Sequence, residues 1–264
     1  MPFLICVARV VSFMRAFSLL DKYNMPKLHL SMKQLKHTFI TIEGTDGSGK
    51  KTQVKKLYEY LKQKGYECLI VSFPNYDSLS SGPVRMYLGG EFGDTADCFD
   101  AYQASVMYAV DRMCTLKQLL KKLTKETIII FDRYVQSNMI HQAGKIRDEH
   151  HVDEFLDWLE VLEFGLLKLP KPDKIIFLDV PVELSYKITT AREQMKIGEA
   201  WTFDIHERDK RHLVDSYLAG KYVADKQGWE VINCNVNGEL KSIDEIHELI
   251  KKAVKPVLKK VTGK

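Results

Sequence analysis

A glycine-rich segment near residue 50 has the residue types that bind phosphate. The strand-like run at residues 39–43 leads into Gly44-Thr-Asp-Gly-Ser-Gly-Lys50, and a helix-like pattern follows. In this context the glycines let backbone N–H groups turn toward phosphate oxygens, the helix N-terminus adds partial positive charge, and Lys50 can reach the β and γ oxygens of a nucleoside triphosphate. The segment predicts a phosphate-donor site; the alternative is a glycine-rich turn that only caps a helix.

The position after the lysine departs from the usual phosphate-binding loop. The Ser or Thr expected there, whose hydroxyl ligates Mg²⁺, is replaced by Lys51, and Thr52 comes one place late. One residue turns a side chain by about 100° around a helix, so Thr52 cannot simply substitute. The mode of Mg²⁺ ligation therefore stays open. We expect the following residues to bind ATP: Gly44, Thr45, Asp46, Gly47, Ser48, Gly49, Lys50, Lys51 and Thr52.

A carboxylate and a guanidinium follow a second buried strand. Asp132-Arg133-Tyr134 comes directly after the apolar residues 128–131. The carboxyl ends of parallel strands meet at one edge of a sheet, so this pair should lie beside the phosphate loop. Phosphoryl transfer gathers metal, acceptor oxygen and positive charge around one centre. We expect Asp132 to hold or organise Mg²⁺ and Arg133 to supply positive charge; the alternative is a surface ion pair.

The elements that would position these residues alternate along the chain. Short β-rich runs at 39–43, 67–72, 127–132, 174–179 and 229–233 are separated by helical patterns. This alternation predicts one α/β domain at residues 37–264, with a five-stranded parallel sheet covered by helices on both faces. Gly65 stands where a helix C-cap belongs, and Ser242 with Glu245 forms a capping box before the last helix. Residues 189–209 lack strong periodicity and are expected to form a short lid.

The chain resembles the thymidylate kinases over residues 37–264. The resemblance rests on residues 43–50, Phe73-Pro74, Tyr108 with Arg112, Asp132-Arg-Tyr134, His141-Gln142 and Leu169-Pro-Lys-Pro-Asp173. Deoxynucleoside kinases, the nearest relatives, typically carry Glu-Arg-Ser at the position of residues 132–134, which favours the monophosphate kinase. The resemblance implies a three-layer P-loop kinase fold, ATP with Mg²⁺ as donor, dTMP as acceptor, dTDP as product, and a homodimer.

The resemblance also implies an acceptor site. Asp46 would accept a hydrogen bond from the 3′-hydroxyl of dTMP, Tyr108 would stack on thymine, and Arg112 would contact the base. Tyr108 and Arg112 are four residues apart and so share one helix face. His141 and Gln142 would close over the sugar where a 2′-hydroxyl would project. The dTMP-binding residues expected are Asp46, Phe73, Arg85, Tyr108, Arg112, Arg133, His141 and Gln142.

Two arginines of the family are absent from their usual places. Asn75-Tyr76 follows Phe73-Pro74 where an arginine would hold the acceptor phosphate, and Arg85 and Arg133 are the candidates to replace it. Gly47 stands where a catalytic arginine could have been, so the lid would supply one, with Arg192 as the first choice and Lys196 and Arg208 in reserve. The catalytic residues expected are Lys50, Asp132, Arg133 and Arg192.

Composition limits the other partners and the location. The net charge of +4 is concentrated in residues 1–36, which hold six basic side chains against Asp21 alone. The near-neutral remainder predicts no nucleic-acid partner, and no apolar run predicts a membrane span. The five cysteines form no C-x-x-C pair, which indicates a reducing compartment, and we expect a cytoplasmic protein.

Residues 1–36 form an N-terminal extension with three interpretations. Met25 and Met32 precede the domain, so the first start codon can be a wrong assignment. The basic, acid-poor composition is also typical of a transit peptide, which would make residues 1–31 an organellar targeting segment. The third interpretation is an ordered extension of the domain.

Two rival functions stay open at the level of sequence. A deoxynucleoside kinase would phosphorylate thymidine itself and would need a carboxylate to accept the 5′-hydroxyl proton. A non-catalytic nucleotide-binding protein is the second rival, because Lys51 occupies the metal-ligand position. Turnover of dTMP and thymidine side by side separates these alternatives.

Overall fold

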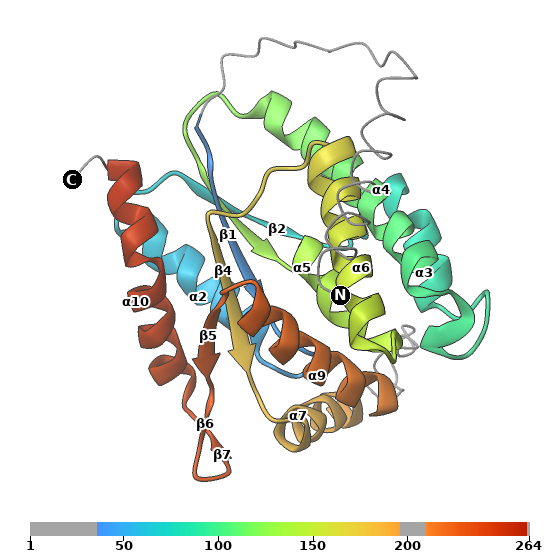
Figure 1. Cartoon of the computed structure of the whole chain (residues 1–264). Helices are drawn as coiled ribbons and strands as arrows, with labels where there is room; N and C mark the ends of the chain where they lie inside the picture. Colours follow the sequence, from blue (N-terminus) through green and yellow to red (C-terminus); the bar gives the residue numbers. More distant parts are fainter. Residues whose placement is uncertain (1–35, 196–209, 263–264) are drawn as a thin grey trace, which may run out of the picture. The chain divides into compact units, whose positions relative to one another are not determined.

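The computed structural model describes residues 36–195 and 210–262 (Figure 1). The extension at residues 1–35 and residues 196–209 of the expected lid lie outside the described residues. Among the helices that are described, none combines the length and the apolar character needed to cross a membrane.

A five-stranded parallel sheet forms the centre of the domain. The strand order is β2-β3-β1-β4-β5, which confirms the predicted sheet. The observed strand bounds lie within one residue of those expected from the sequence. They are β1 (Thr38–Glu43), β2 (Cys68–Ser72), β3 (Ile128–Asp132), β4 (Lys174–Asp179) and β5 (Glu230–Asn233).

Helices cover both faces of this sheet, which makes three layers (Figure 1). Helices α2 (Lys50–Gln63) and α10 (Ile243–Thr262) pack on one face. The other face is covered by four helices: α4 (Ala101–Lys122), α5 (Val135–His141), α6 (Glu149–Glu160) and α9 (Lys210–Lys226). A separate hydrophobic core lies on each face of the sheet, and alternate residues of β3 belong to alternate cores. Ile128 and Ile130 pack toward α2, whereas Ile129 and Phe131 pack toward α5 and α6.

Shorter elements complete the described chain. Helix α3 (Gly82–Leu88) precedes α4, and helix α7 (Val182–Met195) follows β4. A small hairpin joins β6 (Asn235–Val236) to β7 (Glu239–Leu240). The remaining helical turns are 3-10 turns at Leu79–Ser81, Ala96–Cys98 and Ala143–Lys145, and a π-helical turn at Val161–Leu166.

The helix ends confirm the sequence signals, and helix α7 continues into the segment expected to form the lid. Gly65 follows α2 with φ 81°, and Ser242 and Glu245 exchange capping-box hydrogen bonds before α10. Residues 189–195 were expected to be aperiodic, but they continue α7 as a helix. Thr189, the first residue of that segment, is buried, and its hydroxyl donates to the Ser185 carbonyl at 3.0 Å.

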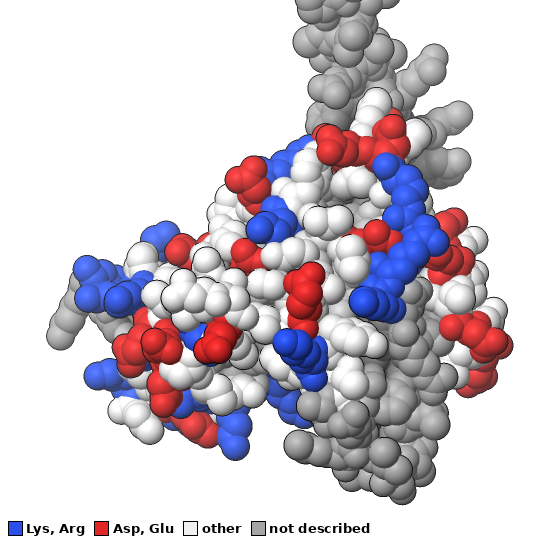
Figure 2. Space-filling view, turned by 90° about the horizontal axis from the view of Figure 1, so that it is seen from below, with Lys and Arg blue, Asp and Glu red and all other residues white. Residues whose placement is uncertain are grey.

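The strand order places the loops after β1 and β3 side by side. Ile42 pairs with Asp132 in the parallel register, so residues after Glu43 and after Asp132 leave the sheet at the same edge. Figure 2 views the molecule from below, the side toward which the strand arrows of Figure 1 point. On the described part of that side, basic and acidic side chains are interspersed. Charge chemistry at this edge therefore depends on individual placed residues.

Candidate active site

The phosphate loop encloses the lysine that sequence analysis singled out. The Lys50 ammonium donates hydrogen bonds to the Gly44 carbonyl at 2.7 Å and the Thr45 carbonyl at 2.6 Å, and its side chain is only 6% exposed. Burial, and after it the nearby Arg133 charge, lower the pKa of Lys50 to about 8. The loop thus holds a preformed, partly desolvated cation at the N-terminus of α2.

The loop has no room for a side chain at position 47. Gly47 has φ 78°, and an added Cβ would lie 2.2 Å from the Ser185 carbonyl oxygen and 2.7 Å from the Thr189 hydroxyl. Real Cβ atoms do not approach backbone that closely, and helix α7 would have to move. An arginine at this position is therefore incompatible with the way α7 packs on the loop.

The residues after Lys50 offer no ready metal cage. Lys51 and Thr52 are both exposed at the start of α2. Across residues 36–195 and 210–262, no three His, Cys, Asp or Glu side chains gather where they could hold a metal ion. Asp132, partly exposed at the end of β3, is the carboxylate next to the loop. One or two carboxylates suffice for Mg²⁺ when substrate phosphates and water supply the other ligands. The residues at this edge therefore fit Mg²⁺ that is bound together with the nucleotide, but not a metal ion that is held by protein ligands alone.

A pocket opens beside the phosphate loop, and we call it the strand-end pocket. It brings together seven of the eight residues expected to bind the acceptor: Asp46, Phe73, Tyr108, Arg112, Arg133, His141 and Gln142. Sequence analysis missed its other lining residues, which are Pro74, Tyr76, Leu88, Ser137 and Asn138. Helical spacing could have indicated Ser137 and Asn138, because both lie within one turn of His141 on α5.

Arg133 joins the phosphate loop to the strand-end pocket. Its guanidinium forms an ion pair with Asp46 of the loop and lies 2.9 Å from His141 Nε2. Burial, together with the Arg133 charge, holds the pKa of His141 well below its ordinary value. His141 is therefore neutral at pH 7, and its Nε2 accepts the hydrogen bond that Arg133 donates. Arg133 itself has φ 67°, a left-handed conformation that is strained in a non-glycine residue.

Arg112 is held at the pocket wall by a buried carboxylate. Its Nε lies 3.1 Å from Glu163 Oε2, its Nη2 pairs with Glu163 Oε1, and its Nη1 donates to the Tyr134 carbonyl at 3.3 Å. The two side chains are 1% and 0% exposed. Glu163 comes from the π-helical turn, 51 residues further along the chain. No local sequence signal could have paired it with Arg112.

Glu43, the last residue of β1, is a second fully buried carboxylate. It accepts the Tyr134 N–H at 2.7 Å and the Ser137 hydroxyl at 2.8 Å. Burial raises its pKa, while the Arg133 charge and these two hydrogen bonds act in the opposite direction. Glu43 does not line the strand-end pocket.

The remaining expected residues either do not line the pocket or are not described. Asn75, where the family arginine would stand, does not itself line the pocket; its backbone N–H donates to Asp111 at 2.8 Å and its side-chain amide donates to Thr115 at 3.1 Å. Arg85 does not line the strand-end pocket, and it donates to the Tyr76 carbonyl at 3.3 Å. The Arg192 side chain, Lys196 and Arg208 lie outside the described residues.

Comparisons with known proteins agree with this geometry. A thymidylate kinase family model matches residues 42–223. A thymidylate kinase of Mycobacterium tuberculosis is 33% identical over 171 residues, which cover 64% of this chain and 78% of that protein. A probable thymidylate kinase of Pyrococcus horikoshii is 32% identical over 220 residues, covering 82% of this chain and 95% of that protein.

A solved structure shares the fold. The thymidylate kinase of Candida albicans superposes with a TM-score of 0.63 at 21% identity, over 84% of this chain and 92% of that one. The match to the family model covers most of the chain and both the phosphate loop and the strand-end pocket. The chain therefore belongs to the thymidylate kinase family, the ATP-dependent nucleoside monophosphate kinases that phosphorylate dTMP.

Proposed function

We propose that this chain phosphorylates dTMP to dTDP with ATP bound at the phosphate loop and dTMP bound in the strand-end pocket. The observation that carries the assignment is the Arg133 bridge, which joins Asp46 of the loop to His141 of the pocket. A donor phosphate on the loop and an acceptor phosphate in the pocket would therefore meet at one guanidinium. Neither rival function is favoured by the family match.

On the donor side, Lys50 binds the transferring phosphate. Its ammonium is already oriented by the Gly44 and Thr45 carbonyls, so phosphate oxygens can take over these hydrogen bonds with little movement. Mg²⁺ would neutralise charge on the phosphates when bound. Asp132, together with water molecules, would hold the ion, because Lys51 replaces the usual hydroxyl. The acceptor is an anionic phosphate, so Asp132 needs no strong general-base role.

On the acceptor side, Tyr108 stacks on thymine and Arg112 contacts the base edge. The Glu163 pair and the Tyr134 carbonyl fix the guanidinium of Arg112, which favours a planar ligand in one orientation. Gln142 is 1% exposed, and its side-chain oxygen accepts no hydrogen bond from the described residues. That oxygen is suited to an N–H or O–H donor of the nucleotide.

The arginines divide between two roles in this proposal. Arg133 holds the acceptor phosphate in preference to Arg85, because Arg133 lines the strand-end pocket and Arg85 does not. A lid residue supplies the second positive charge, with Arg192 as the first candidate. The steric conflict at Gly47 supports this assignment, since it leaves the loop without space for an arginine.

We also propose a homodimer, located in the cytoplasm. Helix α4 carries a stripe of exposed apolar side chains at a spacing of four residues, namely Tyr102, Val106 and Val110. Such a stripe on a soluble helix is suited to burial against a second copy. Sedimentation equilibrium of the wild type and of Val106→Glu tests this assignment, and a monomeric wild type would contradict it. The free cysteines among the described residues are consistent with a reducing compartment.

A coupled assay with a panel of acceptors tests the function. We expect ATP-dependent turnover of dTMP and dUMP, much weaker turnover of UMP, and none of thymidine. Phosphorylation of thymidine would instead indicate a deoxynucleoside kinase. ATP binding without turnover of any monophosphate would indicate a non-catalytic nucleotide-binding protein.

A further inference from the structure

Helix α5 carries much of the acceptor site but has no cap of its own. Ser137, Asn138 and His141 of this short helix line the strand-end pocket. Its N-cap residue, Tyr134, makes no side-chain capping hydrogen bond. The first N–H groups of a helix need an acceptor, and a helix of two turns gains little stability from its own backbone bonds. An external group must therefore hold the start of α5.

Glu43 supplies that external acceptor from a different element. Its two carboxylate oxygens accept one hydrogen bond from the Tyr134 N–H and one from the Ser137 hydroxyl, at 2.7 and 2.8 Å. The side chain is 0% exposed. Burying a carboxylate is costly, and a short polar side chain at the N-cap would satisfy the helix more cheaply. A role limited to capping does not explain why the acceptor comes from β1.

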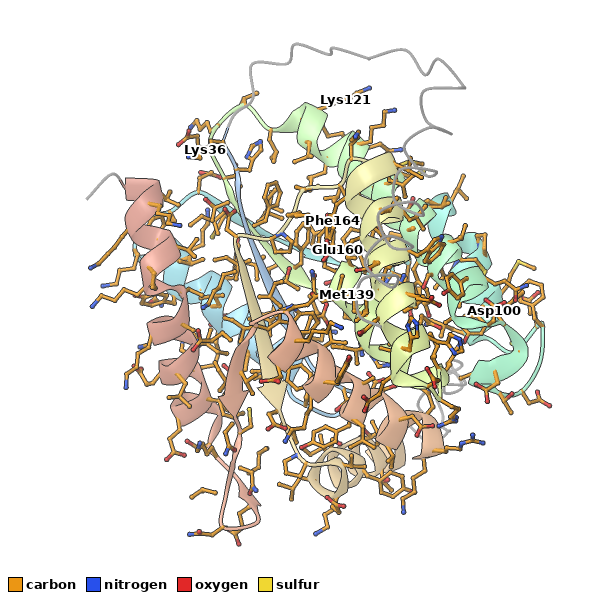
Figure 3. All side chains as sticks on the ribbon, viewed as in Figure 1. Lys36, Asp100, Lys121, Met139, Glu160 and Phe164 are labelled. Carbon is orange, nitrogen blue, oxygen red and sulfur yellow. The ribbon has the colours of Figure 1, made fainter. Side chains whose placement is uncertain are left out.

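The location of Glu43 in the chain provides the explanation. Gly44, the first residue of the phosphate loop, follows it directly. The same carboxylate therefore belongs to β1, the strand that leads into the phosphate loop, and accepts hydrogen bonds from the start of α5, the helix that lines the strand-end pocket. On the opposite side of α5, its own Met139 packs in the apolar core with Phe164 and lies near Glu160 of α6 (Figure 3). That apolar packing restrains the rotation of α5, whereas the bonds to Glu43 fix where the helix begins.

Arg133 is held from both sides by this arrangement. Asp46 pairs with its guanidinium, and Glu43 holds the N–H of the next residue, Tyr134. Both carboxylates come from the β1 strand and its loop. The left-handed backbone of Arg133, at φ 67°, persists only when its surroundings fix it, and these two anchors do so.

We infer that Glu43 is a positioning residue for phosphoryl transfer: it sets the start of helix α5 relative to the phosphate loop, so that the acceptor residues meet the transferring phosphate. This inference rests on the acceptor site proposed above. Glu43 lies outside the strand-end pocket and acts through Tyr134, Ser137 and Arg133.

Two substitutions separate its hydrogen bonds from its bulk. Glu43→Gln keeps both bonds, since the amide oxygen accepts from Tyr134 and the amide nitrogen donates to the Ser137 hydroxyl. Glu43→Leu removes both while filling similar space. We expect kcat/KM for dTMP to fall about tenfold to a hundredfold in Glu43→Leu and less than about threefold in Glu43→Gln. ATP affinity, measured without dTMP, should change less than about threefold in either variant.

Thr41→Val is the matched control on the same strand. Thr41 is buried, and its hydroxyl has no hydrogen-bond partner among the described residues. Its kinetics should stay within about twofold of wild type. Amide hydrogen exchange gives an independent readout, because Glu43→Leu should speed exchange in α5 but leave α2 protected.

Three results would overturn the inference. They are equal kinetics for the Gln and Leu variants, a loss that falls on ATP affinity as much as on dTMP, and unchanged exchange in α5. If Glu43→Leu does not fold, Ser137→Ala removes one of the two bonds from the side of α5, and unchanged kcat/KM for dTMP together with unchanged exchange in α5 would contradict the inference. Failure of the acceptor site itself is distinguishable, since wild type would then not turn over dTMP.

Discussion

Substitution of Glu163 tests whether the buried pair with Arg112 is both a stabilising and a functional feature. Glu163→Gln keeps the size of the side chain but removes its charge. The two side chains are 1% and 0% exposed, so the Arg112 charge would be left uncompensated without screening by water. The amide nitrogen of Gln would also face a guanidinium that has only donors. Removing one partner of such a pair costs about 3 to 5 kcal/mol.

This cost is large compared with the stability of a domain. Unfolding free energies are typically about 5 to 15 kcal/mol, so the variant should lose a substantial fraction of its stability. For a chain of this size the thermal midpoint should fall by roughly 6 to 20 °C. Urea titration measures the free energy of unfolding directly. Because Arg112 would no longer be held at the pocket wall, KM for dTMP should rise while ATP affinity stays close to wild type.

The paired variant Arg112→Met with Glu163→Leu separates stability from function. Replacing both charges by apolar side chains avoids the uncompensated charge and is often neutral or stabilising. One hydrogen bond to the Tyr134 carbonyl is lost, at about 1 kcal/mol. The double variant should therefore be more stable than Glu163→Gln yet bind dTMP poorly. A cost below about 1 kcal/mol for Glu163→Gln, or a double variant as unstable as the single one, would refute the reasoning.

Three further predictions concern the phosphate loop and the base. Because the pKa of Lys50 is lowered to about 8, kcat/KM for ATP should fall as the pH rises through about 8 and the ammonium is lost. The Lys50→Arg variant should lack this alkaline limb, and Lys50→Ala should lower kcat by about 10² or more. Lys51→Thr should keep or raise activity and tighten the Mg²⁺ requirement; a lower rate at saturating Mg²⁺ would show that the lysine itself supplies charge. Tyr108→Ala should weaken dTMP binding by about 1 to 3 kcal/mol in a calorimetric titration, whereas an unchanged affinity would place Tyr108 outside the base site.

The sequence predicted those parts of the molecule that depend on local pattern. The strands are short apolar runs between helical patterns, and the central strands β1, β3 and β4 are largely buried on both faces of the sheet, as a parallel sheet covered by helices requires. The phosphate loop follows from glycine spacing between a strand and a helix. The strand-end pocket follows from topology, because parallel strands bring the residues after β1, β2 and β3 to one edge.

The sequence could not predict partners that tertiary packing selects. Glu163 meets Arg112 across 51 residues, and Glu43 meets Tyr134 across 91, so no periodicity links them. The extent of α7 is a similar case. Its weak amphipathic pattern suggested that regular structure ends near residue 189, yet Ser185 and Thr189 pack against the phosphate loop at Gly47. Tertiary contact here overrides weak local preference, as it commonly does.

The two cations of the site are held by the protein in a way that prepares them for phosphate. Lys50 donates hydrogen bonds to the loop carbonyls, and Arg133 pairs with Asp46. The two positive charges repel each other, and for this reason Arg133 lowers the pKa of Lys50. Without these acceptors the two cations would repel each other and turn toward solvent. Negatively charged phosphates that bind between the two cations relieve this repulsion, so both cations should be held more firmly in the substrate complex than in the free enzyme. Positive charge that is kept in place against its own repulsion needs no reorganisation when negative charge develops on the transferring group, and that preorganisation is the main source of catalysis in phosphoryl transfer.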